Sequence, residues 1–247
     1  MPKYFLLNKL LSKGLQKLSN LLLFLSKYCF YKSLKIFPWK SLNKLDYKVS
    51  KILPEILNKE TFYLEVGAND GIKQSNTYFL ESLYGARGLL IEASPSNFEK
   101  CVINRSSKNL FQHCALVSSS YKSSYLEMIY SDLMTVSTSA TGLKPKNHAR
   151  KGLKFFNGVN YNFFAPAKTL SSILNSFEIR KIDFMSMDIE GGEFEALNGI
   201  NFDEVYIKNI LIETREFENI NKYLMKYGYY LLEKLSQNDY LFTKNLS

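Results

Sequence analysis

Cysteine, histidine and long hydrophobic runs are scarce in this sequence, and each scarcity removes a class of protein. The three cysteines, Cys29, Cys101 and Cys114, are odd in number and form no Cys-x-x-Cys pair, which argues against a disulfide framework and a zinc site. The longest apolar run near the start, residues 21–25, is far shorter than the roughly 20 residues that a membrane-spanning helix needs. No small-residue cleavage site of a secretory signal follows it. We therefore expect a cytoplasmic protein in a reducing compartment.

Acidic residues are almost absent from the first 53 residues. This segment holds eleven lysines and one acid, Asp46, which gives it a net charge of +10. Subtracting this +10 from the +9 of the whole chain leaves −1 for residues 54–247. A near-neutral domain does not form the basic surface that follows a phosphate backbone, so we expect no nucleic-acid partner.

The lysine-rich segment has the leucine spacing of an amphipathic helix. Leucines recur at intervals of three and four residues, at positions 6, 7, 10, 11, 15, 18, 22 and 25. Such a helix either makes peripheral contact with an anionic membrane through its leucines, or packs on the following domain with its lysines in water. Both interpretations stay open. We divide the chain into a basic amphipathic helical leader, residues 1–53, and a domain, residues 54–247.

A strand, a glycine turn and a helix open this domain. We expect the strand at residues 62–66 and the helix at residues 75–84, a unit that holds nucleoside cofactors in doubly wound α/β proteins. Gly67 allows a sharp turn, and Gly71 allows the backbone to approach a ligand closely. Glu65 favours a positively charged cofactor tail over a pyrophosphate. The predicted cofactor-binding residues of this unit are Glu65, Gly67, Asn69, Asp70 and Gly71.

The next two predicted strands extend the cofactor site. Residues 88–92 end in Glu92, 25 residues after Gly67, where a carboxylate receives both hydroxyls of a ribose. The alternative is that Glu92 caps the next helix, which starts near Pro95. A third strand at residues 110–117 would reach the adenine side. The cofactor-binding residues predicted here are Glu92, Ala93, Cys114 and Ala115.

A buried strand in the other half of the domain predicts the catalytic residues. Residues 182–187 are almost continuously apolar, and Asp188 follows at the carboxyl end, the edge where doubly wound sheets bind ligands. Asp188 or Glu190 would accept the proton of a substrate hydroxyl. Alternatively, Glu190 stabilises a helix N-terminus. His148, in a predicted basic loop, is a candidate general base or a solvated loop histidine. We see no second acidic cluster with metal-ligand spacing, so we expect no metal.

The remaining segments predict an insert and a terminal hairpin. Residues 118–168 are longer than a plain crossover requires, which indicates a substrate-facing insert. A strand at residues 209–213 and a helix at residues 217–227 follow the catalytic strand. Two alternating segments, residues 229–235 and 239–243, then predict an antiparallel hairpin.

Several of these segments, in this order, resemble the FkbM family of methyltransferases. The segments that carry the resemblance are EVGANDG at 65–71, SNTYFLE at 75–81, GLLIEASP at 88–95, Asn104-Arg105 and IDFMSMDIEGGE at 182–193. The resemblance covers about residues 60–244. Three mild departures are Glu65, Ala93 and Gly192, which stand where the family often has Asp, Pro and a larger residue.

The resemblance implies an α/β fold with a doubly wound, mostly parallel, seven-stranded Rossmann-like sheet and a C-terminal antiparallel hairpin. It also implies O-methylation, with methyl transfer from S-adenosyl-L-methionine to a hydroxyl of a sugar, a glycan or a small molecule. The hairpin weighs against an NAD(P)-dependent reductase, which shares the opening strand-turn-helix unit. The intact carboxylates weigh against a catalytically inactive, membrane-associated relative. Both alternatives stay open at this point.

Overall fold

The computed structural model describes residues 22, 38–156 and 159–244. The chain divides into two units, Met1–Pro38 and Trp39–Ser247. The leucine-rich helix predicted for the leader therefore lies almost entirely outside the described residues. Within the part of the chain that is described, no helix combines the length and the apolar character needed to cross a membrane.

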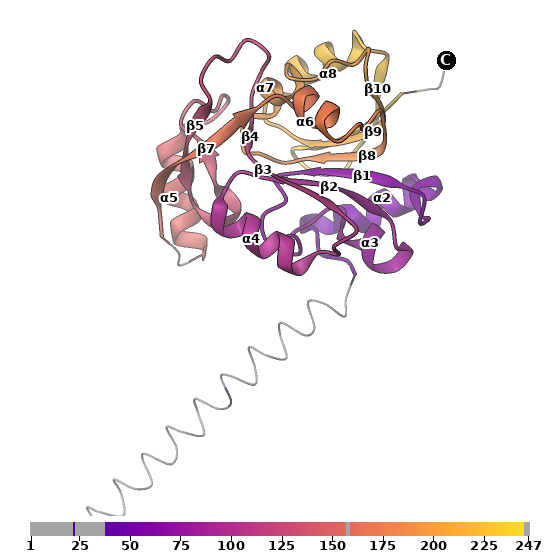
Figure 1. Ribbon diagram of the computed structural model, residues 1–247, viewed down its shortest axis with the longest axis horizontal. Helices are drawn as coiled ribbons and strands as arrows, with labels where there is room; N and C mark the ends of the chain where they lie inside the picture. Colours follow the sequence, from indigo (N-terminus) through magenta and orange to yellow (C-terminus); the bar gives the residue numbers. More distant parts are fainter. Residues whose placement is uncertain (1–21, 23–37, 157–158, 245–247) are drawn as a thin grey trace, which may run out of the picture. The chain divides into compact units, whose positions relative to one another are not determined.

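A seven-stranded sheet forms the centre of the second unit, with the strand order β10-β11-β9-β8-β1-β2-β3 (Figure 1). Its strands are β1 (Phe62–Val66), β2 (Arg87–Glu92), β3 (Leu110–His113), β8 (Lys181–Met187), β9 (Tyr206–Glu213), β10 (Tyr229–Lys234) and β11 (Asp239–Lys244). Neighbours from β9 to β3 are parallel, and β11 is antiparallel to both β9 and β10. The predicted doubly wound sheet with a terminal antiparallel hairpin is thus confirmed.

Helices cover both faces of this sheet (Figure 1). One face packs against α6 (Leu170–Ser176), α7 (Glu193–Leu197) and α8 (Phe217–Met225), and the other against α2 (Leu45–Ile52), η2 (Pro54–Ile56), α3 (Tyr78–Tyr84) and α4 (Pro95–Asn104). The short turn η1 (Leu42–Lys44) precedes α2 and has no buried residue. Because side chains alternate along a strand, Met185 of β8 faces the first core and Phe184 the second. Burial on both sides explains the nearly continuous apolar run that we read in β8.

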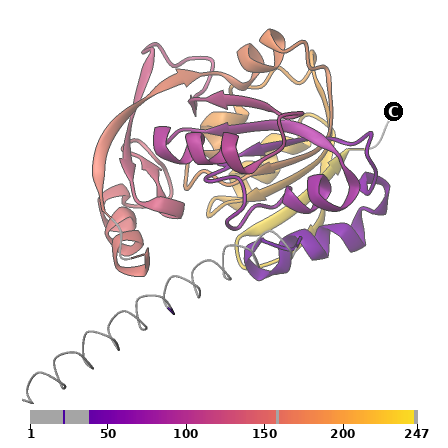
Figure 2. The ribbon, with the colours of Figure 1, turned by 60° about the horizontal axis from the view of Figure 1, so that its bottom comes forward.

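Residues 39–53, which we placed in the leader, pack with the domain. Val49 of α2 is fully buried in the same core cluster as Leu241 of β11, and Figure 2 shows α2 beside the yellow C-terminal strand. The Lys48 ammonium donates a hydrogen bond to the Leu235 carbonyl oxygen at 2.6 Å. The first packed helix of the domain therefore precedes residue 54, because its apolar face is buried against the hairpin at the far end of the sequence.

The segment predicted as a third strand forms two strands in different sheets. β3 completes the main sheet, whereas β4 (Ala115–Leu116) pairs with β7 (Tyr161–Lys168) in a second sheet of order β4-β7-β5-β6. The break falls at Cys114, whose N–H donates to the Glu92 carbonyl oxygen at 3.1 Å. The second sheet also contains β5 (Tyr125–Tyr130) and β6 (Val136–Ser137), so the predicted insert is a small β-layer beside the main sheet (Figure 1).

The loop predicted around His148 is wrong, because this segment is helix α5 (Pro145–Phe156). Its packing face is made of His148, Ala149 and Gly152, which give no large apolar residue at helical spacing. A Cβ atom at Gly152 would lie 2.2 Å from the hydroxyl oxygen of Ser131, so α5 approaches the neighbouring turn η3 (Asp132–Met134) more closely than a larger residue permits. Close packing of small residues therefore forms a helix that periodicity did not predict.

Candidate active site

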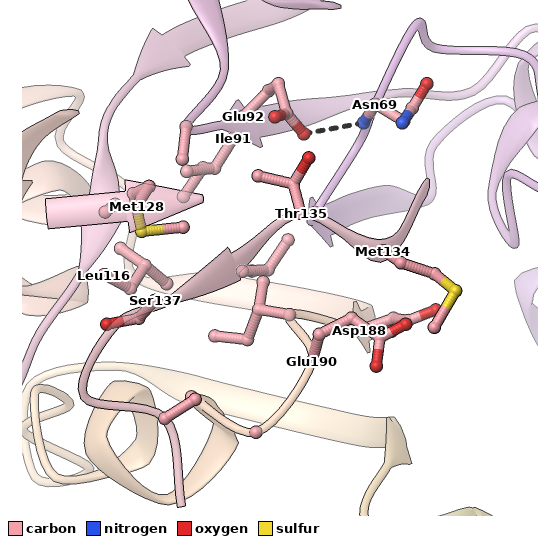
Figure 3. A pocket seen from close by; sticks show the side chains of 18 of the residues that line it. Asn69, Ile91, Glu92, Leu116, Met128, Met134, Thr135, Ser137, Asp188 and Glu190 are labelled. Atoms are coloured by element: carbon pink, nitrogen blue, oxygen red, sulfur yellow. Dashed lines mark hydrogen bonds between the residues drawn. The ribbon is translucent and has the colours of Figure 1, made fainter. Parts of the chain in front are cut away.

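A cavity of about 530 Å³ lies where the carboxyl ends of the main-sheet strands face the insert (Figure 3). Its lining includes nine of the residues predicted for cofactor and catalysis: Gly67, Asn69, Glu92, Ala93, Cys114, Ala115, His148, Asp188 and Glu190. The insert contributes Met128, Met134, Thr135 and Ser137 to the lining. A volume of this size is ordinary for a small-molecule site.

Glu92 forms one end of this cavity (Figure 3). Its Oε2 accepts a hydrogen bond from the Asn69 backbone N–H at 2.8 Å, and its Oε1 accepts one from the Ser94 N–H at 2.7 Å. Burial raises the pKa of the Glu92 carboxyl, while these amide donors favour its ionised form. The Ser94 bond also fixes the start of α4. Glu92 therefore lines the cavity, as a ribose ligand must, and also supports the helix that follows, so its two predicted roles are compatible.

Gly67 allows β1 and β8 to approach each other at the edge of the cavity. Its φ of +83° is in the left-handed region, and a Cβ atom there would lie 1.9 Å from the carbonyl oxygen of Asp188. The Asp188 N–H donates to the Val66 carbonyl oxygen at 3.1 Å. The glycine turn therefore keeps the Asp188 backbone beside the strand that precedes the cofactor turn.

Three residues predicted to bind cofactor, Glu65, Asp70 and Gly71, lie outside the cavity lining. The Glu65 carboxylate accepts hydrogen bonds from two buried hydroxyls and pairs with Arg105 at 3.1 Å. Asp70 Oδ1 accepts from two backbone N–H groups of the turn that follows it. A Cβ atom at Gly71 would lie 2.8 Å from Cγ of Arg105, so its small size accommodates Arg105. All three residues therefore stabilise the turn without lining the cavity.

Arg105 is the buried cation under this turn, and our sequence reasoning gave it no role. Its side chain has no exposed surface, and its guanidinium donates to Glu81 at 2.7 Å, to Glu65 at 3.1 Å and to the Tyr63 hydroxyl at 2.7 Å. The sequence does contain a signal for this cluster. Glu65 and Glu81 lie in the mainly apolar elements β1 and α3, and Arg105 follows the last residue of α4. Charges inside apolar elements need a partner of opposite sign.

Asp188 and Glu213 are adjacent carboxyls in the cavity wall at the catalytic end. They follow Met187 and Ile212, which are partners in the parallel β8–β9 ladder. Burial, assisted by the charge of Glu190, raises the pKa of Glu213 to about 7. Burial and the adjacent Glu213 raise the pKa of Asp188 well above its usual range. Two adjacent carboxyls repel each other when both are ionised, so the pair binds one proton more readily than an isolated carboxyl does.

Glu190 lies beside two basic side chains in the same cavity. Its Oε2 lies 3.0 Å from Nε2 of His148 and 3.2 Å from a guanidinium nitrogen of Arg215. His148 Nε2 makes no aligned hydrogen bond in this contact. Glu190 has a φ of +53°, a left-handed conformation that a non-glycine residue keeps only where its surroundings fix it. The fold therefore brings His148 and Glu190 together, as candidate catalytic residues must be, and adds Arg215.

Glu213 gives the protein a measurable pH dependence of stability. Its folded-state pKa of about 7 exceeds the ordinary carboxyl value of 4.5, so the folded protein binds more protons than the unfolded chain between these values. The free energy of unfolding should therefore rise as the pH falls from about 8 to about 6. Urea unfolding at both pH values measures this, and Glu213→Gln should remove much of the difference. An unchanged pH dependence in the variant would contradict the assignment.

Similar solved structures include three methyltransferase chains. The methyltransferase FkbM from Methylobacillus flagellatus KT is 13% identical over 75% of this chain and 44% of its own, with a TM-score of 0.45. The human methyltransferase 10 domain containing protein is 11% identical over 81% of each chain, with a TM-score of 0.44. M. capricolum TrmK, solved with S-adenosyl-homocysteine, is 9% identical over 80% and 66%, with a TM-score of 0.40. The chain thus spans less than half of the M. flagellatus protein.

A family model gives the assignment. No curated protein sequence matches the chain. The model of the methyltransferase FkbM domain matches residues 65–233, which run from β1 into β10 and include Glu92, Asp188 and Glu213. This match confirms the resemblance and decides against the NAD(P)-dependent reductase. The chain therefore belongs to the FkbM family of S-adenosylmethionine-dependent methyltransferases.

Proposed function

We propose that this protein O-methylates a hydroxyl group of a glycan or of another hydroxyl-bearing small molecule. The observation that carries the proposal is the proton-sharing pair of Asp188 and Glu213 in the wall of the cavity that also contains Glu92. A hydroxyl oxygen is a weak nucleophile near neutral pH, and it must lose its proton as it attacks. A pair of adjacent carboxyls, in which burial raises the pKa of Glu213 to about 7, is suited to take that proton.

The residues at the other end of the cavity fit the methyl donor. Glu92 offers an ionised carboxylate for the two ribose hydroxyls, and Ile91 and Leu116 offer apolar surface beside Cys114 and Ala115 for the adenine. The turn at Gly67 and Asn69 would hold the amino-acid tail. When bound, S-adenosylmethionine supplies a methyl group that its sulfonium has already activated.

The chain's own residues then position the acceptor and move one proton. While the pair holds a single proton, one carboxyl is still ionised, so Asp188 can accept the hydroxyl proton, and both carboxyls are protonated after the step. Glu190 pairs with Arg215 and lies beside His148, and these contacts hold the three side chains at the cavity. Correct placement of the hydroxyl accounts for most of the expected acceleration, because the donor is already reactive.

Calorimetric titration with S-adenosylhomocysteine tests the cofactor half of this proposal. We expect wild-type protein to bind it, and Glu92→Ala to bind roughly 10- to 100-fold more weakly, because a charged hydrogen-bonding partner of the ribose is lost. Glu99→Ala, on the exposed surface of α4, is the matched control and should bind like wild type. If Glu92→Ala bound S-adenosylhomocysteine as tightly as wild type, Glu92 would not be a cofactor ligand. Binding without methylation of any hydroxyl compound would instead indicate an inactive fold.

We further propose that the enzyme acts in the cytoplasm with its lysine-rich leader at an anionic membrane surface. The seven lysines and the leucine spacing of residues 1–38 support this, since they suit a helix lying in the interface. Sedimentation with phosphatidylglycerol vesicles tests it. We expect co-sedimentation that high salt reverses, whereas vesicles of neutral lipid should leave the protein in the supernatant.

A further inference from the structure

A second cavity, also of about 530 Å³, adjoins the first at the Asp188–Glu213 pair, whose residues line both. Its walls come from segments that are far apart in sequence: η1 and α2, the loop after β1, the ends of β8 and β9, and the turn between β10 and β11. None of the residues predicted to bind the cofactor, all of which the structure describes, belongs to this lining. The second cavity therefore lies beside the catalytic pair but apart from the donor half.

Asn76 indicates that this second cavity receives a ligand. Its side chain lines the cavity, is 8% exposed, and donates through Nδ2 to the Ser186 hydroxyl at 3.1 Å. Its Oδ1 has no hydrogen-bond partner among the described residues. A buried carbonyl oxygen without a donor costs free energy, and a ligand that draws this side chain toward the cavity and donates a hydrogen bond to it would recover that cost.

The rest of the wall also favours a ligand that donates hydrogen bonds. Asp188, Glu213 and Asp239 add carboxyl oxygens, while the Lys48 ammonium already donates to a backbone carbonyl. A proton bound by the Asp188–Glu213 pair and the Lys48 ammonium near Asp239 offset part of the negative charge of this wall, so it also suits a neutral ligand. Hydroxyl groups meet this demand, because each one donates a hydrogen bond and can also accept one.

We infer that the second cavity binds a neutral, hydroxyl-rich, sugar-like part of the acceptor and presents one of its hydroxyls to Asp188. This inference rests on the proposed function, since it locates the binding site for the acceptor of the proposed methyl transfer. Gln237 lies on the exposed turn between β10 and β11 and lines the cavity. Because it is exposed, a larger side chain at this position should not disturb the core. It therefore offers a variant that fills the cavity and leaves the donor half intact.

Saturation-transfer NMR on the full chain, loaded with S-adenosylhomocysteine, tests the inference with the methyl glycosides of glucose, galactose, mannose, fucose and rhamnose as probes. We expect wild-type protein to bind at least one glycoside, and Gln237→Trp to bind it at least about tenfold more weakly. Leu232→Trp, exposed on the same hairpin and outside both cavities, is the matched control and should bind normally. Asn76→Ala should weaken the glycoside without changing affinity for S-adenosylhomocysteine.

The outcomes separate this inference from the proposed function. Equal glycoside binding by Gln237→Trp and wild type would overturn it, as would the absence of glycoside binding in loaded wild-type protein. A roughly tenfold loss of S-adenosylhomocysteine affinity in Gln237→Trp would also overturn it, because the cavity would then hold part of the donor. Wild-type protein that fails to bind S-adenosylhomocysteine at all would defeat the proposed function itself.

Discussion

Asp188→Asn is expected to slow methyl transfer by roughly a hundred- to ten-thousandfold, the contribution of a positioned general base. Asn has the shape of Asp but cannot accept the hydroxyl proton, and it ends the proton sharing with Glu213. The affinity for S-adenosylhomocysteine should change little, because Glu92 and the turn at Gly67 hold the donor in our assignment. Single-turnover methylation of an acceptor found by the glycoside screen measures the rate.

A second carboxylate provides the control for this variant. Glu195 also lines the first cavity, but it is exposed and lies outside the pair, so Glu195→Gln should methylate at close to the wild-type rate. Glu213→Gln should lose less activity than Asp188→Asn, since Asp188 remains to take the proton. Wild-type rates in Asp188→Asn would show that the acceptor loses its proton elsewhere, and attention would move to His148.

Arg105→Met is expected to lower the free energy of unfolding by about 3–5 kcal/mol, the usual cost of removing one partner from a buried ion pair. The substitution would leave the buried carboxylates of Glu65 and Glu81 without their cation. It would also free the Tyr63 hydroxyl from its 2.7 Å hydrogen bond. Urea unfolding, followed by circular dichroism, measures the loss.

The control for this substitution is an arginine at the surface. Arg87 is exposed at the start of β2, so Arg87→Met should change the free energy of unfolding by no more than about 0.5 kcal/mol. Adding Glu65→Gln and Glu81→Gln to Arg105→Met should restore part of the stability, because the unpaired charges disappear with their partner. A triple variant less stable than Arg105→Met would show that the hydrogen bonds matter more than the charges.

The sequence was most informative where a residue's position relative to a strand decides its role. The position of Glu92 and Asp188 at the cavity could be predicted because each ends an apolar parallel strand, and such ends meet at one edge of the sheet. Glu213 carries the same signal at the end of β9, but we did not apply it there. The main sheet followed from apolar runs and turns, because burial on both faces leaves a strong pattern.

Features that depend on packing between distant segments escaped prediction. The helix at His148 has a packing face of small residues, so no periodic apolar stripe marks it. The roles of Glu65 and Gly71 were assigned to a ligand because their spacing is that of a cofactor turn, yet both contact Arg105, more than thirty residues later. Pairings of this kind are set by the fold and are invisible to local patterns.

The contact between α2 and the terminal hairpin also bears on biosynthesis. The hydrogen bond from Lys48 to Leu235 joins residues 187 positions apart. On the ribosome, β1, β2 and β3 emerge long before β10 and β11, so the nascent chain exposes the apolar face of α2 until the final strands leave the exit tunnel. Such late closure slows folding and makes the unfinished chain a client for chaperones. The second cavity is then the last part of the enzyme to be built, and translation must run almost to its end before an acceptor can be held.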